Sequence, residues 1–447
     1  MKYWIALIFL ISSFSSFSQD QLKNIQVSPT FHWRTFWMST SYPEDFRDDY
    51  ALGTSVAVGF RAKVHQKWTV QASYRGFANV FSSDIWELEP YSKRENRYET
   101  GLFNFLEPGQ QVFGSLEILN LSYQTKSWKV AVGRMPINTA WINPADGRLA
   151  PTLMEGATVS YSPSKSWKFS GWYINRFRVR GTNQFLNIGE SIGVYGVGRD
   201  ETGATSAYQG NTHSNFVSVV QAEFFKEGHH YTFSHTLADN LFSTFWGDWN
   251  YKFPKKEGGL SWILGVQAGY QHGIGDGGNP ESTFRYKNPN DQNWVISLSG
   301  GLEYGKGKTV LGFTQLGGQG RWLSPREWGK DAWFTFVPRE RNEGMGQLTA
   351  LTLLSEYNLG NQWNVYGHFG FHWLPDFADA AANKYAFPSY RQVNLGVKFK
   401  PEKMPKADFH LLVMNKEALG SPTLSPAQRY NKVEMIHVNF IVNFRIE

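Results

Sequence analysis

The chain has 447 residues and a net charge of +6, with no cysteine, 18% charged residues and 16% aromatic residues. The absence of cysteine excludes disulfide bonds, thiolate metal sites and a lipid-anchored N-terminal cysteine. The charge is spread along the chain rather than gathered in basic tracts, which excludes a nucleic-acid-binding arm.

Residues 1–18 have the layout of a secretory signal peptide. Lys2 is followed by an apolar run from Trp4 to Ile11 and then by small, serine-rich residues up to Gln19. This run of roughly eight apolar residues is too short to span a bilayer, for which a helix needs about 20. We therefore expect residues 1–18 to be removed and residues 19–447 to form the mature domain.

Period-two alternation dominates the rest of the chain, and no stretch has the 18 or so consecutive apolar residues of a membrane helix. In residues 363–373, WNVYGHFGFHW, one face carries apolar residues and the other carries polar residues and histidine, with Trp363 and Trp373 at the two ends of the apolar face. An apolar band between aromatic ends is typical of a strand that faces lipid. The same alternation in residues 50–64, 260–271 and 294–304 favours an outer-membrane barrel over a secreted sandwich.

Short turns and long loops alternate along the chain. Polar turns are expected at 65–67, 125–127, 162–165, 226–228, 254–259, 305–308, 359–362 and 401–406. Longer polar segments lie at about 81–110, 137–152, 181–214, 273–291, 320–346, 375–388 and 417–431. With a first strand near 27–38 and a last one near 432–446, the pattern predicts an all-β transmembrane antiparallel barrel of about 18 strands. The short turns would be periplasmic, the long loops extracellular, and the lumen aqueous.

Residues 175–181, NRFRVRG, place Arg176, Arg178 and Arg180 at alternate positions of one predicted strand. If the more apolar set of this strand faces lipid, the three arginines face the lumen at intervals of about 6 to 7 Å. Such a row of guanidinium groups can pass an anion from one to the next. The same parity turns four further cations inward: Arg34, Arg61, Lys63 and Arg75. Two alternatives remain open: the three arginines mark the extracellular rim beside lipid phosphates, or a one-residue bulge reverses their facing.

A motif follows the fifth predicted strand. Residues 133–161, GRMPINTAWINPADGRLAPTLMEGATVSY, contain in order Gly133, Pro136, Asp146, Arg148, Leu149, Pro151 and Gly156. This segment resembles the OprD-type family of substrate-specific outer-membrane porins, whose third extracellular loop has an Asp-x-Arg-Leu-x-Pro run and folds into the barrel. The resemblance implies an 18-stranded channel narrowed by this loop, with Asp146 and Arg148 at the constriction. It also implies small nutrients as solutes, often carboxylates or amino acids and in some members sugars. Alternatively, Asp146 and Arg148 pair with each other or cap a turn.

Together these features predict a passive porin in the outer membrane of a Gram-negative bacterium. It would admit small anionic or amphoteric nutrients, such as carboxylates, amino acids or oligosaccharides, past an arginine-lined constriction without a cofactor or metal. Its partners would be outer-membrane lipid, lipopolysaccharide and the solutes, with both a monomer and a homotrimer open. A barrel with a lumen plugged by residues 81–110 and 181–214, serving as an adhesin or secretion anchor, is the main alternative. An outer-membrane lipase or protease is less favoured, because no nucleophile and histidine cluster near one strand end.

Overall fold

The computed structural model describes residues 25–43, 46–144, 147–255, 259–420 and 422–446, so the predicted signal peptide lies outside the described residues. The strands in this part of the chain are β1 (Ile25–Ser41), β2 (Asp49–Val64), β3 (Trp68–Ser82), β4 (Val112–Gln124), β5 (Trp128–Met135), β6 (Leu153–Tyr161), β7 (Trp167–Arg178), β8 (Leu186–Asn187), β9 (Val217–Lys226), β10 (His229–Ala238), β11 (Phe242–Lys252), β12 (Ser261–Gly273), β13 (Gln292–Tyr304), β14 (Gly307–Gln319), β15 (Leu348–Leu359), β16 (Trp363–Trp373), β17 (Tyr390–Phe399), β18 (Ala407–Ala418) and β19 (Met435–Ile446). The short helices are η2 (Thr100–Leu102), η3 (Gly189–Ser191), η4 (Ser282–Phe284) and α3 (Pro426–Arg429). No helix among the described residues is long and apolar enough to cross a membrane.

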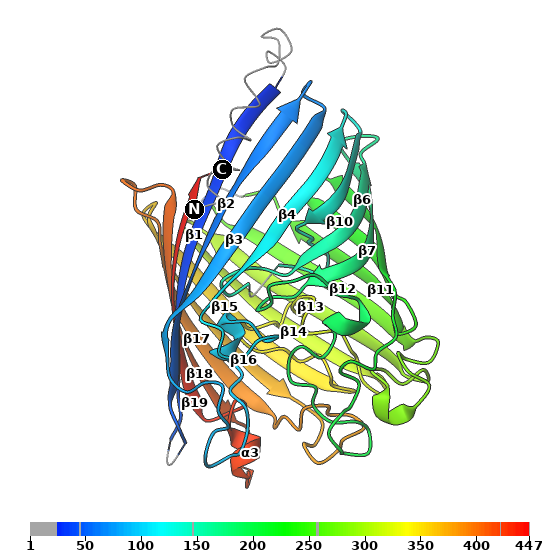
Figure 1. Cartoon of the computed structure of the whole chain (residues 1–447), viewed down its shortest axis with the longest axis vertical. Helices are drawn as coiled ribbons and strands as arrows, with labels where there is room; N and C mark the ends of the chain where they lie inside the picture. Colours follow the sequence, from blue (N-terminus) through cyan, green and yellow to red (C-terminus); the bar gives the residue numbers. More distant parts are fainter. Residues whose placement is uncertain (1–24, 44–45, 145–146, 256–258, 421, 447) are drawn as a thin grey trace, which may run out of the picture.

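The strands form one closed antiparallel barrel (Figure 1). Each strand of the wall pairs with its neighbour in sequence, and β19 pairs with β1 from Phe31 opposite Ile446 to Ser41 opposite Ile436. The two-residue strand β8 extends β7 at Arg176 and Phe177, whereas β9 pairs with β7 only as far as Ile174. Without β8, the 19 strands of the described sheet leave a wall of 18, which confirms the predicted fold class.

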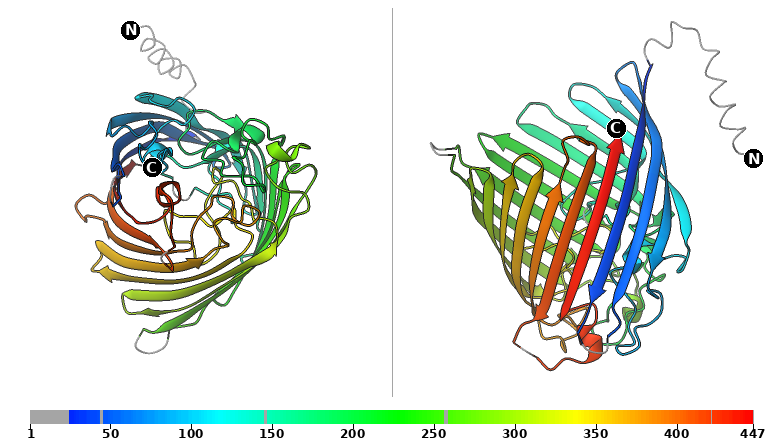
Figure 2. Two further views of the ribbon diagram at one scale, coloured as in Figure 1. Left: turned by 90° about the horizontal axis from the view of Figure 1, so that it is seen from below. Right: turned by 90° about the vertical axis from the view of Figure 1, so that its left-hand side faces the viewer.

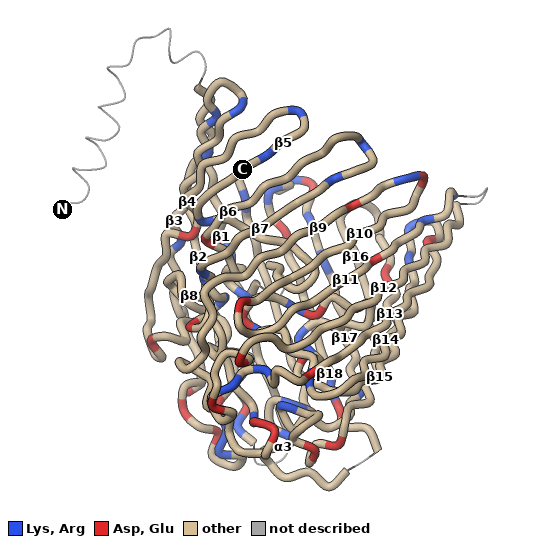
Figure 3. Tube along the Cα trace, turned by 90° about the vertical axis from the view of Figure 1, so that its right-hand side faces the viewer, with Lys and Arg blue, Asp and Glu red and all other residues tan. Residues whose placement is uncertain are grey.

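The two ends of the barrel differ as expected. All eight predicted turns connect neighbouring strands at one end, which we call the turn end. Lys and Arg residues lie at several of these turns (Figure 3). The connections at the other end, the loop end, are L1 (42–48), L2 (83–111), L3 (136–152), L4 (179–216), L5 (239–241), L6 (274–291), L7 (320–347), L8 (374–389) and L9 (419–434). The long polar segments predicted from the sequence correspond to L2, L3, L4, L6, L7, L8 and L9.

Side chains alternate between the outer and inner faces of the wall. In β16, the end residues Trp363 and Trp373 are 44% and 46% exposed on the outer face, whereas His368 and His372 of the inner face are only 8% and 1% exposed. In β19, Ile436 and Phe440 likewise point outward, and the asparagines and His437 between the apolar residues are buried inside. This is the alternation of an apolar outer band around a polar interior.

The long loops fold back into the barrel rather than away from it (Figure 2, left). Three clusters of buried apolar side chains join the inner face of the wall to L2, L3, L4, L7 and L8. L3 contributes to all three clusters, through Ile142, Leu149 and Trp141 respectively. The hydrophobic core of this protein therefore lies inside the barrel, at the loop end, and is built largely from loops.

Gly156 tests how tightly the wall is packed at the bulge between β6 and β7. A Cβ atom added here would lie 2.0 Å from the backbone oxygen of Tyr173, so Gly156→Ala must displace the backbone. We expect a cost of roughly 1 to 3 kcal/mol. The temperature at which the barrel loses its heat-modifiable mobility on a denaturing gel should fall, whereas Gly76→Ala, with no atom within 4 Å of the added Cβ, should leave it unchanged. Equal effects of the two substitutions would contradict this account.

Candidate solute pathway

L3 crosses from β5 to the wall formed by β1 and β2. Ser55 of β2 donates a hydrogen bond to the carbonyl of Leu149 at 3.0 Å, and the guanidinium of Arg34 on β1 donates to the carbonyl of Arg148. Gly53 makes this approach possible, because a Cβ atom there would lie 2.8 Å from the Leu149 side chain. Arg148 is buried in a left-handed conformation with φ of 42°, and Asp146 lies outside the described residues.

The middle of L3 is held by tryptophans and by L7. The Trp141 ring lies 5.2 Å from Trp246 of β11 and from Trp322 of L7, and 5.5 Å from Trp333 of L7. Asn143 donates its backbone N–H to the carbonyl of Trp328 at 3.1 Å. L3 and L7 therefore form one layer across the lumen, built on aromatic packing.

A cavity of about 630 Å³ lies inside the barrel against this layer. Its lining comes from L3 and L7 and from inward-facing residues of β11, β12, β14, β15 and β16. Aromatic rings and charges of both signs line it: Trp246, Trp333, Phe334 and Phe336, with Lys308, Lys330, Asp248 and Asp331. Such a mixed lining can contact both the ring and the charged groups of a small organic solute.

Basic residues line the other side of the lumen, on β1, β2 and β3. Arg61 and Lys63 of β2 are exposed on the inner face, and Arg34 of β1 is half-buried and donates to the side chain of Asn443 at 2.6 Å. Arg75 of β3 is buried and holds Glu117 through two hydrogen bonds of 2.7 and 3.0 Å. The cations nearest the turn end are therefore the ones most open to water.

The three arginines of the 175–181 segment have different surroundings. The pairing of β6 with β7 skips Asn175, because Glu155 pairs with Arg176 while Gly156 pairs with Ile174. Arg178 lies inside the barrel, 1% exposed, and donates to the carbonyl of Pro151 at 2.7 Å. Arg180 also lies in the interior, in L4, where its guanidinium donates to the hydroxyl of Tyr195 at 3.1 Å.

Arg176 lies on the outer face of the wall. Its neighbours across β6 and β5 are Glu155 and Arg134, and Arg134 pairs in turn with Leu119, which is 47% exposed on the outer face. Directly paired residues share a face of a sheet, so the whole row points outward. The bulge at Asn175 thus turns Arg176 to the opposite face from the buried Ile174, whereas Arg178, the last residue of β7, lies inside the barrel.

Buried charges tie the long loops to one another. Glu340 of L7 binds Arg97 of L2 and Lys416 of β18, each at 2.7 Å. Burial alone would raise the pKa of Glu340, but Arg97 and Lys416 hold it well below its usual range. Lys384 of L8 lies over the rings of Tyr208 and Tyr286, 4.5 and 4.7 Å from their centres, and burial lowers its pKa to about 7 against the opposing effect of Glu343. The inference from sequence missed this network, which no local motif marks.

Comparison with solved structures supports the architecture. No protein-family model matches the chain, and no curated protein matches it by sequence. Acinetobacter baumannii OccAB3 is similar, with a TM-score of 0.71 and 12% identity over 94% of this chain and 100% of that chain. Pseudomonas aeruginosa OpdK, crystallised with vanillate, has a TM-score of 0.69 and 9% identity over 94% of this chain and 98% of its own. Pseudomonas aeruginosa OccD3 (OpdP) has a TM-score of 0.69 and 10% identity over 94% and 91%.

The fold is that of the OprD-type porins. The resemblance carried by residues 133–161 is thereby confirmed for the architecture. At 9 to 12% identity, the likeness extends over nearly the whole chain while few side chains are shared. The solute must therefore be argued from this chain's own residues.

The lowered pKa of Lys384 predicts a pH dependence of loop stability. In the folded protein this amine loses its proton near pH 7, whereas in an unfolded chain it does so near 10.5. The unfolded state binds more protons between these values, so stability should rise with pH, by up to about 1.4 kcal/mol per pH unit. Hydrogen exchange of residues 374–389, converted to opening free energies at pH 7 and 9, should show this rise. Lys384→Met should reduce the slope, and an unchanged slope would disprove the assignment.

Proposed function

We propose that the protein is a passive channel in the outer membrane of a Gram-negative bacterium, through which small solutes diffuse. The observation that carries this proposal is the closed barrel of 18 strands. Its loops L3 and L7 form a layer across the lumen and leave beside it a cavity lined by aromatic rings and by charges of both signs. The short turns would face the periplasm and L1 to L9 the exterior. Diffusion down a gradient requires no cofactor and no chemical step, and Pseudomonas aeruginosa OpdK, which has this fold, is an outer-membrane protein.

The solutes we propose are small anionic or amphoteric molecules, with aromatic carboxylates fitting the lining best. The exposed cations Arg61 and Lys63 attract a carboxylate along one wall. The cavity on the other wall offers Lys308 for a carboxylate, Asp248 for an amine and the half-buried Phe336 for a ring. The structure of OpdK with vanillate provides a precedent for an aromatic carboxylate in this fold.

The proposed constriction lies where L3 meets the basic wall. Arg34 holds L3 at the Arg148 carbonyl, and the buried Arg75 and Arg178 share Glu117, at 2.7 and 3.6 Å. Arg34 and Arg61 are therefore proposed to contact the solute, whereas Arg75, Arg148, Arg178 and Arg180 add positive potential around the passage. Asp146 belongs to the same loop but lies outside the described residues, so its place at the constriction stays a prediction from the sequence. Arg176 has no place in this pathway because it lies outside the barrel.

A second candidate is a barrel closed by its loops that serves as an adhesin or secretion anchor. It is favoured by the deep burial of apolar loop residues inside the barrel, among them Ile85 and Phe103 of L2 and Ile188 and Ile192 of L4. The two candidates differ in one physical property, the presence of a continuous aqueous path.

Planar-bilayer recording distinguishes the candidates. The purified protein should give stepwise conductance, and its reversal potential under a salt gradient should show anion preference. Arg61→Gln with Lys63→Gln should shift the reversal potential toward cations, because two exposed lumenal charges are lost. Arg176→Gln is the matched control and should leave selectivity unchanged. A protein without conductance would favour the closed anchor, and an unchanged reversal potential in the double variant would disprove the role of this wall.

Trp141 should control the width of the passage. Trp141→Ala removes the ring that joins L3 to three other tryptophans, a loss of roughly 3 to 5 kcal/mol of packing. L3 should then leave the lumen part of the time, and the single-channel conductance should become larger and noisier. Trp128→Ala, at an outer-face position that is 48% exposed, is the control. Unchanged conductance in Trp141→Ala would exclude L3 as the constriction.

A further inference from the structure

A row of polar residues interrupts the apolar outer face on β5 to β8. Arg134, Glu155, Arg176 and Asn187 occupy successive strands in direct register. Glu155 binds Arg134 at 2.7 Å and lies 3.7 Å from Arg176, which donates to Asn187 at 3.3 Å. Two guanidinium groups share one carboxylate, so the row keeps a net positive charge. The Arg176 side chain is 46% exposed and the Arg134 side chain 29% exposed.

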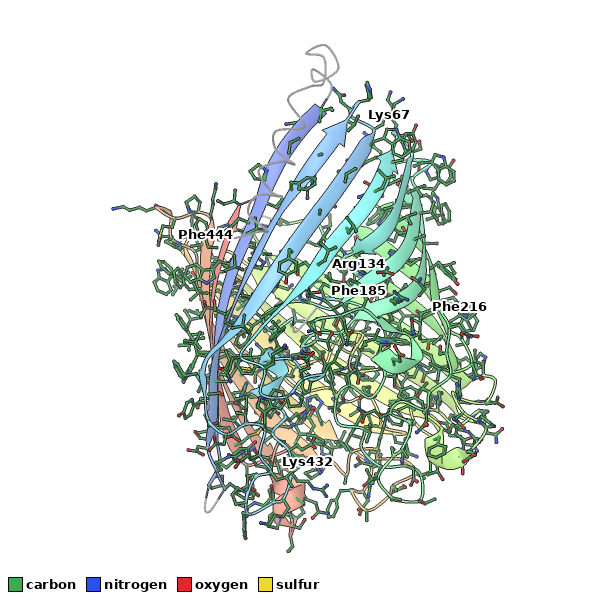
Figure 4. All side chains as sticks on the ribbon, in the orientation of Figure 1. Lys67, Arg134, Phe185, Phe216, Lys432 and Phe444 are labelled. Atoms are coloured by element: carbon green, nitrogen blue, oxygen red, sulfur yellow. The ribbon has the colours of Figure 1, made fainter. Side chains whose placement is uncertain are left out.

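The row lies at the loop-end border of the apolar band. On β7, the exposed apolar positions run from Trp167 to Tyr173, whose ring stacks on Phe216 at 5.5 Å, and Arg176 follows directly. Figure 4 shows Arg134 beside Phe185, with Phe216 farther along the same wall, and the Phe185 ring lies 4.4 Å from the Arg134 guanidinium. Aromatic side chains at a barrel's edge mark the level of lipid headgroups, so the row lies where lipid phosphates lie.

A groove lies on the same outer face, on the turn-end side of the row. It has a volume of about 970 Å³ and runs across β6, β7 and β9 to β12. Its floor includes small residues such as Gly171, Gly247 and Ala268, and Phe169, Phe233 and Phe245 line it. The lining of the groove is almost entirely apolar. A barrel wall without a groove would give an acyl chain no recess of this kind.

The distance between row and groove suits a membrane lipid. Gly171 of the groove precedes Arg176 by five positions on β7, and Val159 follows Glu155 by four on β6. At about 3.3 Å per residue, these separations are roughly 13 to 16 Å. Half of a bilayer's hydrocarbon core is about 15 Å thick. An acyl chain of a lipid whose headgroup lies on the row is therefore long enough to reach the groove.

We propose that this outer face is a binding site for a phosphate-bearing lipid of the outer leaflet. The phosphate accepts hydrogen bonds from Arg134 and Arg176, whose planar guanidinium groups match phosphate oxygens, and one acyl chain fills the groove. Glu155 holds the two guanidinium groups on one side of the phosphate. The inference requires the barrel to lie in a membrane, as the proposed function does, but not that it conducts.

Native mass spectrometry of the purified barrel, titrated with phosphatidic acid, tests the site. Arg134→Gln with Arg176→Gln should weaken binding at least about tenfold, or about 1.4 kcal/mol, because both charge-assisted contacts to the phosphate are lost. The control is Arg391→Gln: Arg391 of β17 also lies on the outer face, away from the groove, and donates to Glu417 of β18 at 2.9 Å. The Arg391→Gln variant should bind phosphatidic acid with the same affinity as the unmodified protein. Equal affinity of the double variant and the unmodified protein would overturn the proposal.

A second variant tests the groove without touching the charges. An added Cβ atom at Gly247 would lie 3.7 Å from its nearest neighbour, the Phe233 ring, so Gly247→Leu fills the groove without a backbone clash. It should also weaken phosphatidic acid binding. Complete displacement by inorganic phosphate, with no effect of Gly247→Leu, would instead indicate a free-phosphate site and overturn the lipid assignment. Heat-modifiable mobility verifies that each variant is folded, and bilayer conductance of the same variants reports on the channel independently.

Discussion

Closure of the hydrogen-bond ladder is the constraint on which the rest of this structure depends. Inside a bilayer no water is present to hydrogen-bond the free N–H and C=O groups of a strand edge. The last strand of a membrane-spanning sheet must therefore pair with the first. The pairing of β19 with β1 meets this requirement, and it explains why the chain alternates so regularly: each spanning strand has one face toward lipid and one toward the lumen. The aromatic ends of β16, with Trp363 and Trp373, follow from the same two-phase environment.

A ring of 18 strands is too wide for its own side chains to fill, and this creates the second requirement. The long loops fill this space, because their apolar side chains form a core inside the barrel. Trp141, Trp322 and Trp333 pack where a smaller barrel would have strand side chains, and buried ion pairs such as Glu340 with Arg97 hold the loops in place. A cation left without a counter-charge at this depth would be costly, which explains why the buried Arg75 pairs with Glu117. The exposed cations lie nearer the turn end.

Local sequence patterns predicted the strands of the barrel wall but not the contacts between the loops inside the barrel. Turns, alternation and the long loops depend on a few neighbouring residues, and they were inferred correctly along the chain. The resemblance of residues 133–161 to the OprD-type porins also predicted that L3 folds into the barrel. The partners of L3 could not be inferred, because Trp322 and Trp333 are almost 200 positions from Trp141 in the sequence. The ion pairs of Glu340 could not be inferred either, since no local sequence pattern near Glu340 indicates Arg97 or Lys416 as its partners. The bulge at Asn175 was foreseen only as an alternative, since strict alternation and a one-residue shift leave the same sequence signature.

The bulge at Asn175 decides the facing of Arg176. Without it, Arg176 would share the inner face with Ile174, which is fully buried. With it, Arg176 joins Arg134 and Glu155 at the outer border of the apolar band, while Arg178, at the end of β7, lies beside Glu117 inside the barrel. An arginine on the lipid face is costly at the middle of a bilayer but not at the headgroup level, so the outer position is stable only because β7 has already passed Tyr173. The register of the wall thus decides that Arg176 faces lipid rather than the interior of the barrel.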